Sequence, residues 1–449
     1  MGGAHPLDDF LTAACVPLDG SWHGDGDLQA AEAVRAAHPQ LATSTIHAAA
    51  ALGDDAAVAA FLAADRTLAT AQGGPHGWDP LTYLCFSRYL RLDRARAPAF
   101  LRAAEALLDA GASAGTGFFS AAHQPDPEWE SVLYGAAGVA RDAALTRLLI
   151  ARGADPNDEE TPYHAVETVD DAVVEALLDS GRLSADSLTT MLHRKLDWQH
   201  IEGVRLLLAR GADPNTLSRW GRRSLHHAVE RTSPPVFFET LLDAGADPAL
   251  ARRDGTSLLS CVAQAGRADV LELLARRGFP TSASGDDAFL LACTRGDEPA
   301  ARAALAAEPG LLARLQAAHP SLLADFAGAG NTAGVRLLLD LGADLAASTS
   351  RGGAARDSAL HVAVWRERPD TVALLVARGA NLEATNRRGD SPLELAVRAQ
   401  VEQSDWTPHR SLAIIGTLLA AGARVDSVKT FPSGSTPVDD LLRAAGRTG

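Results

Sequence analysis

Histidine recurs at one position in several short segments of this sequence. Each segment has four residues and ends in His, as Thr161-Pro162-Tyr163-His164 does. A row of imidazoles could bind a metal or transfer protons. Neighbouring positions of this row would lie on the order of 10 Å apart, too far for one metal to bridge, so we predict no metal site. The histidines at this position are His47, His164, His193, His226 and His361.

Carboxylate, phenol and imidazole side chains also gather between about residues 77 and 231. If they lined one closed pocket, they could perform general acid–base chemistry on a small molecule. This gives one hypothesis of function, a cofactor-free enzyme of the isomerase, cyclase, lyase or hydrolase type. Its candidate catalytic residues are Asp79, Tyr134, His164, His193 and Asp197.

The sequence lacks the common motifs of nucleotide-binding and zinc-dependent enzymes. It has no GxxxxGK[ST] or GxGxxG segment after a strand and no HExxH segment, so we predict no nucleotide, cofactor or catalytic zinc. The cysteines form no CxxC pair and stand far apart, which predicts free thiols in a reducing compartment. They are Cys15, Cys85, Cys261 and Cys293.

Composition narrows the class of protein further. Hydrophobic residues make up 47% of the chain but aromatic ones only 5%, which indicates many small helices packed through Ala and Leu. The formal charge of −15 argues against nucleic-acid binding. No apolar run reaches the roughly 18 residues of a membrane span, and the start MGGAHP resembles no signal peptide. We therefore expect a cytoplasmic protein with no membrane partner. Nearly all its basic residues are arginine, a bacterial-type composition.

The helices that would position these residues are clearest between Thr190 and Val229. Thr190 is a suitable N-cap for a short helix from Met191 to Trp198. A second helix is expected from Ile201 to Arg210, with apolar residues at helical spacing. Gly211 can end this helix in the left-handed conformation. The stretch thus predicts one helix–turn–helix unit and the start of another.

Variants of this unit recur along the chain. A Gly-Ala pair follows a leucine-rich helix seven times, and Gly181 and Gly278 occupy the same place without the alanine. With the gap after Gly278 counted as two units, the spacing averages about 33–35 residues, the period of a helix-pair solenoid. Residues 288–307 form a degenerate unit with its turn at Gly296, and units near 286–307 and 321–345 have lost the segment that ends in His. The pairs begin at Gly111, Gly153, Gly211, Gly245, Gly342, Gly379 and Gly422.

The segments Thr161-Pro162-Tyr163-His164 and Ser358-Ala359-Leu360-His361, with Gly-Ala-Asp after the second helix, resemble the ankyrin-repeat family and its T-P-L-H signature. The resemblance covers residues 43–445, about eleven repeats and a terminal half repeat. It implies an all-α fold, an ankyrin-type helix–turn–helix solenoid with short hairpin loops and capping helices. We expect caps at 1–42 and 431–449, the solenoid at 43–430, and insertions near 86–99, 113–128 and 400–409.

The resemblance also assigns roles to residues. The signature histidine would hydrogen-bond the backbone turn of the neighbouring repeat. Hairpin residues and the ends of first helices would face a partner, and Trp and Arg at such positions are typical binding anchors. The alternative is that each tryptophan packs on its neighbour's hairpin. The predicted partner-facing residues are Trp78, Phe86, Trp129, Asp197, Trp198, Trp220, Arg222, Arg223, Glu230, Arg231, Trp365 and Arg366.

The favoured hypothesis of function is a protein-binding scaffold or adaptor with a concave groove lined by Trp and Arg. Its expected partner is another protein. The acid–base enzyme, whose partner would be a small molecule, is the first alternative. The second is a regulatory or immunity protein that blocks another protein's active site with its acidic surface. We expect no cofactor and no metal under any of the three.

Overall fold

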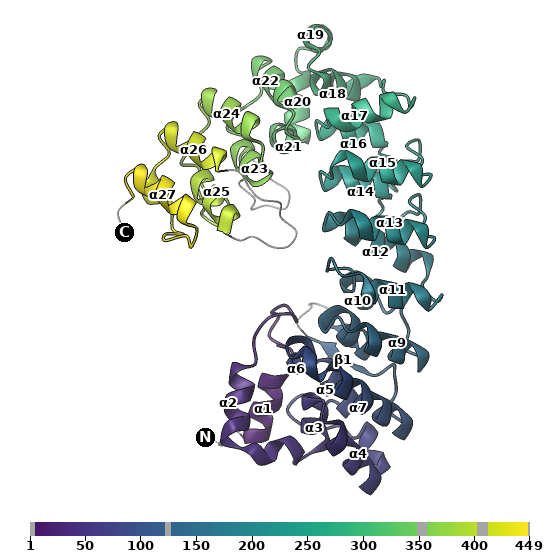
Figure 1. Ribbon diagram of the computed structural model, residues 1–449. Helices are drawn as coiled ribbons and strands as arrows, with labels where there is room; N and C mark the ends of the chain where they lie inside the picture. The colour runs from purple at the N-terminus through teal and green to yellow at the C-terminus, as the bar shows by residue number, and fades with distance from the viewer. Residues whose placement is uncertain (1–4, 122–126, 348–356, 402–411, 448–449) are drawn as a thin grey trace. The chain divides into compact units, whose positions relative to one another are not determined.

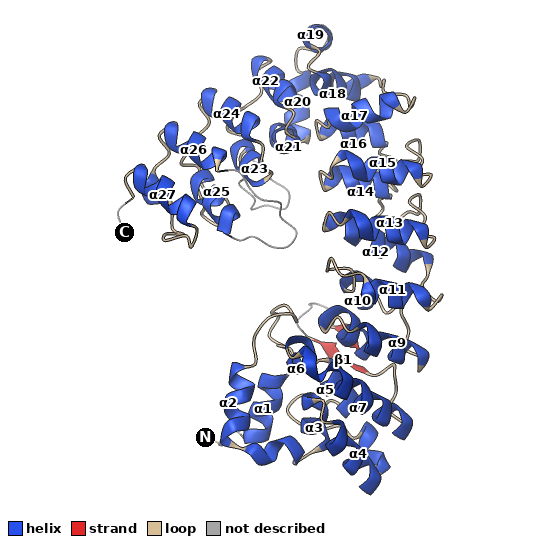
Figure 2. Ribbon diagram, viewed as in Figure 1, coloured by secondary structure: helices blue, strands red, loops and turns tan. Residues whose placement is uncertain are grey.

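The computed structural model describes residues 5–121, 127–347, 357–401 and 412–447, and within them the chain is almost wholly helical (Figures 1 and 2). The all-α prediction is confirmed. The contacts divide the chain into two compact units, Met1–Asp213 and Pro214–Gly449, a division that the sequence did not predict. None of the described helices is both long and apolar enough to cross a membrane.

The first unit contains short helices, most of which lie side by side in pairs (Figure 1). They are α1 (Pro6–Ala14), α2 (Gln29–Ala37), α3 (Ile46–Leu52), α4 (Asp55–Ala64), α5 (Pro80–Cys85), α6 (Arg88–Leu92), α7 (Ala97–Ala110), α8 (Val132–Tyr134), α9 (Ala143–Ala151), α10 (Glu160–His164), α11 (Ala172–Asp179), α12 (Ala185–Asp197) and α13 (Ile201–Ala209).

These pairs stack in two layers. The first helices form one layer, in which α3, α5, α8, α10 and α12 pack in succession. The second helices α4, α7, α9 and α11 form the other. The pair α3–α4 shows the local cause: Thr45 caps α3 by accepting from the Ala48 N–H, and Gly53 ends it at φ 64°. The two layers bury the Ala and Leu side chains of the core.

The predicted helix from Met191 to Trp198 was wrong at its start. Helix α12 begins at Ala185, because Ser184 caps it by accepting from the Ser187 N–H at 3.1 Å. Thr190 therefore lies inside the helix and not at its cap. The neighbouring Thr189 fits there because its hydroxyl donates to the Ala185 carbonyl one turn earlier, at 2.7 Å.

Two of the three expected insertions have regular structure. The one near 86–99 is helical and holds α6 and the start of α7. The one near 113–128 begins an antiparallel hairpin of β1 (Gly117–Ser120) and β2 (Glu128–Ser131), in which Phe119 pairs with Trp129. Strand β2 runs directly into α8 and a π-helical turn, Gly135–Val139. The third, near 400–409, falls mainly on residues 402–411, outside the described residues.

The second unit continues with helix pairs of the same kind (Figure 1). Its helices are α14 (Ser224–Glu230), α15 (Pro235–Asp243), α16 (Leu258–Gln264), α17 (Ala268–Arg276), α18 (Gly285–Arg295), α19 (Glu298–Ala307), α20 (Leu311–Ala318), α21 (Leu322–Ala329), α22 (Thr332–Asp340), α23 (Ala359–Trp365), α24 (Pro369–Ala377), α25 (Pro392–Val401), α26 (Ala413–Ala420) and α27 (Thr436–Ala444).

The stacking order changes where the sequence loses the histidine segment. Helix α18 packs on α16 as a first helix should, but it also packs on the second helix α22. Helix α21 packs mainly on α23 and also contacts α16. Asn331 fixes this arrangement, because its side-chain amide donates to the Gly266 carbonyl at 2.9 Å and to the Thr294 carbonyl at 2.8 Å. Two turns distant in sequence are thereby tied to one side chain.

Candidate functional site

Two of the predicted partner-facing aromatic residues belong to the core of the first unit. Trp78 is only 5% exposed and stacks on Phe118, with 4.4 Å between ring centroids. Phe86 is fully buried and packs edge-on against Phe118 at 4.9 Å. Phe118 comes from the hairpin insertion, which covers both rings. The prediction that Trp78 and Phe86 are exposed to a partner was therefore wrong, and the packing alternative holds for these two.

Two other tryptophans of the first unit lie nearer the surface. Trp129 is 37% exposed on β2 and meets the exposed Phe119 edge-on, with 4.9 Å between centroids. Trp198 directly follows α12 and is half-buried. The Arg194 guanidinium lies 5.9 Å from the Trp198 ring and 4.0 Å from the ring of Tyr163. Such cation–π contacts fix the indole against its own helix.

A buried polar cluster joins the N-terminal segment to the hairpin. His23 Nδ1 lies 3.2 Å from the Tyr134 hydroxyl and 3.1 Å from a carboxylate oxygen of Glu130. The ring of Tyr134 is 5.3 Å from that of His164. Burial raises the pKa of Glu130 to about 7, against a weaker opposing effect of its hydrogen bond with Ser120. This carboxyl group therefore changes charge near neutral pH.

The cluster continues as a chain of ion pairs around His164. Its Nε2 lies 3.2 Å from Glu160 and its Nδ1 lies 3.2 Å from Glu167. Burial disfavours the imidazolium, but the two carboxylates outweigh it and raise the pKa of His164 to about 9. Glu167 also pairs with Arg194, which pairs with Asp197 at 2.6 Å. Each charge in this chain faces an opposite one.

The candidate catalytic residues are only partly brought together. Tyr134 and His164 are in contact, and His164 connects to Asp197 through Glu167 and Arg194. Asp79 instead caps α5, where it accepts from the Thr82 N–H at 2.9 Å and from the Thr116 hydroxyl. His193 is buried within α12. Tyr134 and His193 are both buried, so neither reaches a substrate in solvent.

The second unit carries the remaining predicted residues. Trp220 is 38% exposed at a hairpin tip and Trp365 is 44% exposed at the end of α23. Arg222 pairs with Glu230 at 2.6 Å, and Arg252 pairs with the same carboxylate at 2.9 Å. These pairs tie the end of α14 to two hairpins. They leave both indoles accessible at the surface.

Two of the predicted arginines bond to backbone carbonyls. Arg223 donates to the carbonyl of Ala251 at 2.9 Å and to that of Asn215, and so ties its hairpin to the next. The exposed Arg366 donates to the Arg231 carbonyl at 3.3 Å. Arg223 thus has a structural role, whereas Arg366 is an exposed residue with one bond to a backbone carbonyl.

Cavities lie beside these residues. One of about 260 Å³ is lined by the ends of α14, α16, α21 and α23, including Glu230, Arg252 and Arg366. A second, of about 430 Å³, lies between α23, α25 and the hairpin before α25, and includes Trp365 and Arg366. Val362 and Arg366 line both cavities. The two cavities therefore adjoin at the end of α23.

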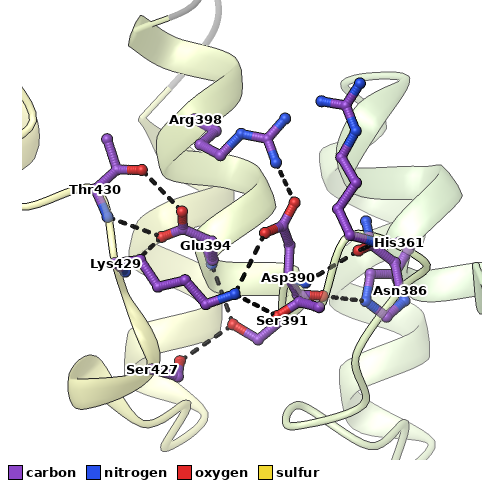
Figure 3. A network of polar contacts seen from close by, with 11 residues as sticks. His361, Asn386, Asp390, Ser391, Glu394, Arg398, Ser427, Lys429 and Thr430 are labelled. Atoms are coloured by element: carbon purple, nitrogen blue, oxygen red, sulfur yellow. Dashed lines mark hydrogen bonds and ion pairs between the residues drawn. The ribbon is translucent and has the colours of Figure 1, made fainter.

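A polar network supports the second cavity (Figure 3). The Nε2–H of His361 donates to the Asp390 carbonyl at 3.2 Å, so this histidine ties its repeat to the next turn, as the family resemblance implied. His47 does the same with the Ala71 carbonyl at 2.8 Å. Asp390 also pairs with Arg398, which lines the cavity. The network holds the imidazole and the guanidinium in place.

Glu394 occupies the histidine position in the following repeat, and it accepts hydrogen bonds where the histidine donates one (Figure 3). Its carboxylate accepts from the backbone N–H of Lys429 at 2.8 Å and of Thr430 at 3.3 Å, and from the Thr430 hydroxyl at 2.8 Å. Where a histidine donates to a carbonyl of the next turn, this glutamate accepts from its amides.

Several residues of these sites escaped prediction. The ion-pair chain depends on Glu160, Glu167 and Arg194, which no repeat position singled out. Arg387 and Arg388, which line the larger cavity, could have been found. Arg388 precedes the turn residue Gly389 as Trp220 precedes Gly221, and both glycines have φ near 77°. Trp220 was selected because hairpin residues beside the turn glycine are expected to face a partner, and the same rule selects Arg388.

No group of three or more His, Cys, Asp or Glu side chains within the described residues could hold a metal ion. Free thiols occur at all cysteine positions, and each is buried: Cys15, Cys85, Cys261 and Cys293.

The stacked helix pairs, hairpin turns and histidine ties define a helix-pair repeat protein. The family model for the ankyrin repeat matches residues 356–387, so this segment is an ankyrin repeat. How many repeats the chain contains beyond that match stays a prediction.

Two ankyrin repeat domains of known structure are similar to parts of this chain. The crystal structure of the human ASB11 ankyrin repeat domain is 18% identical, with a TM-score of 0.26, and the match covers 57% of this chain and 98% of that one. The ankyrin repeat domain of Bcl-3 is 21% identical, with a TM-score of 0.24 and coverage of 65% and 99%. The comparison with curated proteins found no match.

Proposed function

We propose that this chain is a protein-binding scaffold whose second unit presents the main binding surface. The observation that carries the proposal is the pair of adjoining cavities at the end of α23, lined by residues from first helices far apart in sequence. Solenoids of stacked helix pairs typically bind partners along such a surface. Exposed indoles and guanidiniums beside it, at Trp365 and Arg366, suit a protein partner.

Trp220 and Trp365 are the proposed anchors. Burying a tryptophan in an interface removes a large apolar area from water, and its ring loses little conformational freedom on binding. Arg222 and Arg252 both already pair with Glu230, so these three residues are proposed to form a polar rim and not the main source of affinity. The ankyrin repeat at 356–387, which contains Trp365 and Arg366, also supports protein binding.

The experiment is affinity capture from the native host with Trp220→Ala combined with Trp365→Ala. The matched control is Trp22→Ala, because Trp22 is 49% exposed in the first unit and belongs to no predicted surface. Bound proteins are quantified for each variant, and helical content and thermal unfolding confirm that the variants fold. We expect the double variant to lose specific partners that the control retains. Equal retention by both variants would contradict the proposal.

A further inference from the structure

The cavity of about 430 Å³ between α23 and α25 has an uneven charge. Its rim carries four arginines against one carboxylate, Asp357. Arg398 pairs with Asp390, just outside the cavity. The other three arginines form no ion pair within the described residues, although the Asp325 carboxylate acts electrostatically on the first of them: Arg366, Arg387 and Arg388. In a chain with a formal charge of −15, this is a local concentration of unneutralised positive charge.

The hairpin that carries two of these arginines is held in one conformation. Asn386 donates its N–H to the Asp390 carbonyl at 3.0 Å. Its side-chain oxygen accepts from the N–H groups of Arg388 at 2.9 Å and Asp390 at 3.0 Å. The His361 imidazole ties the same turn to α23 (Figure 3). Because the backbone is fixed before a ligand arrives, binding does not need to order the loop.

One wall of the cavity is apolar. Trp365, Val362 and Leu395 line it beside the guanidiniums, and the indole is 44% exposed. The volume of about 430 Å³ is in the range of ligand-binding pockets. The cavity therefore offers an apolar contact with cations around it.

We propose that this cavity binds an acidic segment of a partner protein, in which carboxylate side chains flank an apolar one. The inference rests on the proposed protein-binding function and names the chemistry of the partner. Guanidinium groups bind carboxylates through paired, charge-assisted hydrogen bonds, and the planar cation also tolerates an aromatic neighbour. The apolar side chain of the partner would lie on Trp365, and its carboxylates would reach Arg366, Arg387 and Arg388.

Nucleic acid is the other polyanion that arginine binds. It needs cations along an extended track, because affinity grows with the number of phosphates neutralised. This cavity is one compact patch on a strongly acidic chain, and its apolar wall fits a side chain. An acidic peptide accounts for both features.

The test uses the full chain and a fluorescein-labelled peptide of alternating glutamate and leucine, with a lysine and leucine peptide for comparison. We expect only the glutamate peptide to bind, with an affinity that falls as salt rises. Arg387→Glu combined with Arg388→Glu should weaken binding by about tenfold or more, the loss of charge-assisted hydrogen bonds. Arg276→Glu combined with Arg336→Glu is the matched control, because both arginines are exposed in the second unit outside the cavity.

Several results would overturn the inference. They are no binding of the glutamate peptide, equal binding of the lysine peptide, an equal loss in the control, or tighter binding of a single-stranded oligonucleotide of equal charge. The capture experiment distinguishes failure of the acidic-segment inference from failure of the proposed protein-binding function. Partners lost with Trp365→Ala but fully retained by Arg387→Glu with Arg388→Glu would preserve protein binding and refute the acidic segment.

Discussion

Replacing Glu394 tests whether this glutamate ties its repeat to the next turn, as the histidine does in other repeats. The side chain is 1% exposed and accepts three hydrogen bonds from Lys429 and Thr430, in the turn before α27. Glu394→Ala leaves two backbone N–H groups and one hydroxyl without their acceptor. A hydrogen bond to a charged group contributes about 1.5–3 kcal/mol, and water replaces part of each. We therefore expect a loss of about 3–5 kcal/mol in local stability.

Glu394→Gln keeps one acceptor oxygen but turns its amide group toward a donor, so it should cost about 1–3 kcal/mol. The assay is hydrogen exchange at the amides of Lys429 and Thr430, which reports local opening of the terminal helix. For Glu394→Ala, protection there should fall by about a hundredfold or more. Glu383→Ala is the matched control, because this exposed carboxylate accepts from the Arg424 N–H at 2.8 Å in the same region. Unchanged exchange in Glu394→Ala, or an equal loss in Glu383→Ala, would refute the role assigned to Glu394.

Three further changes test the first unit. Folding raises the pKa of His164 from 6.5 to about 9, so protonated His164 adds about 3 kcal/mol to the free energy of unfolding below pH 6.5. This stabilisation is lost as the pH rises to 9. Urea unfolding of His164→Gln should lack the decline, and parallel pH profiles of the variant and the unmodified protein would contradict the expectation. Trp78→Ala should destabilise the unit by about 3–5 kcal/mol by emptying its contact with Phe118, whereas a change below 1 kcal/mol in thermal unfolding would show an exposed indole. Lys195→Ala should cost about 3–5 kcal/mol, because the buried ammonium pairs with Asp171 at 2.6 Å, and a neutral effect in urea unfolding would refute that ion pair.

The sequence predicted the helix pairs well because their signals are local. Gly53, Gly211 and Gly296 end helices in the left-handed conformation, as a glycine after a periodic apolar stretch indicates. The start of α12 was missed because Thr190 is a good cap in isolation, while Ser184 forms the actual one. Which of two possible N-caps starts a helix depends on contacts with other parts of the chain, and a local sequence pattern does not contain those contacts.

The candidate site was harder to predict, because exposure depends on what an insertion covers. The spacing placed Trp78 on a hairpin, but it did not show that Phe118 from the later insertion would fold over it. The ion-pair chain around His164 joins residues from α10 to α12, and no repeat rule relates their positions. Trp220, Trp365 and Arg388 lie at hairpin tips or helix ends and are exposed, and their role in binding stays a prediction.

We expect the cavities at the end of α23 to be covered by another protein in the native host. The most direct measurement places photoreactive benzoylphenylalanine at Trp365 in the native host and identifies the covalent adducts formed on illumination. The same replacement at Trp22 is the control, because that indole is exposed but lies in the first unit. We predict a discrete protein adduct at Trp365 whose yield falls when Arg387 and Arg388 are changed to glutamate. A Trp365 adduct pattern identical to that of Trp22, or no protein adduct at Trp365, would contradict the account.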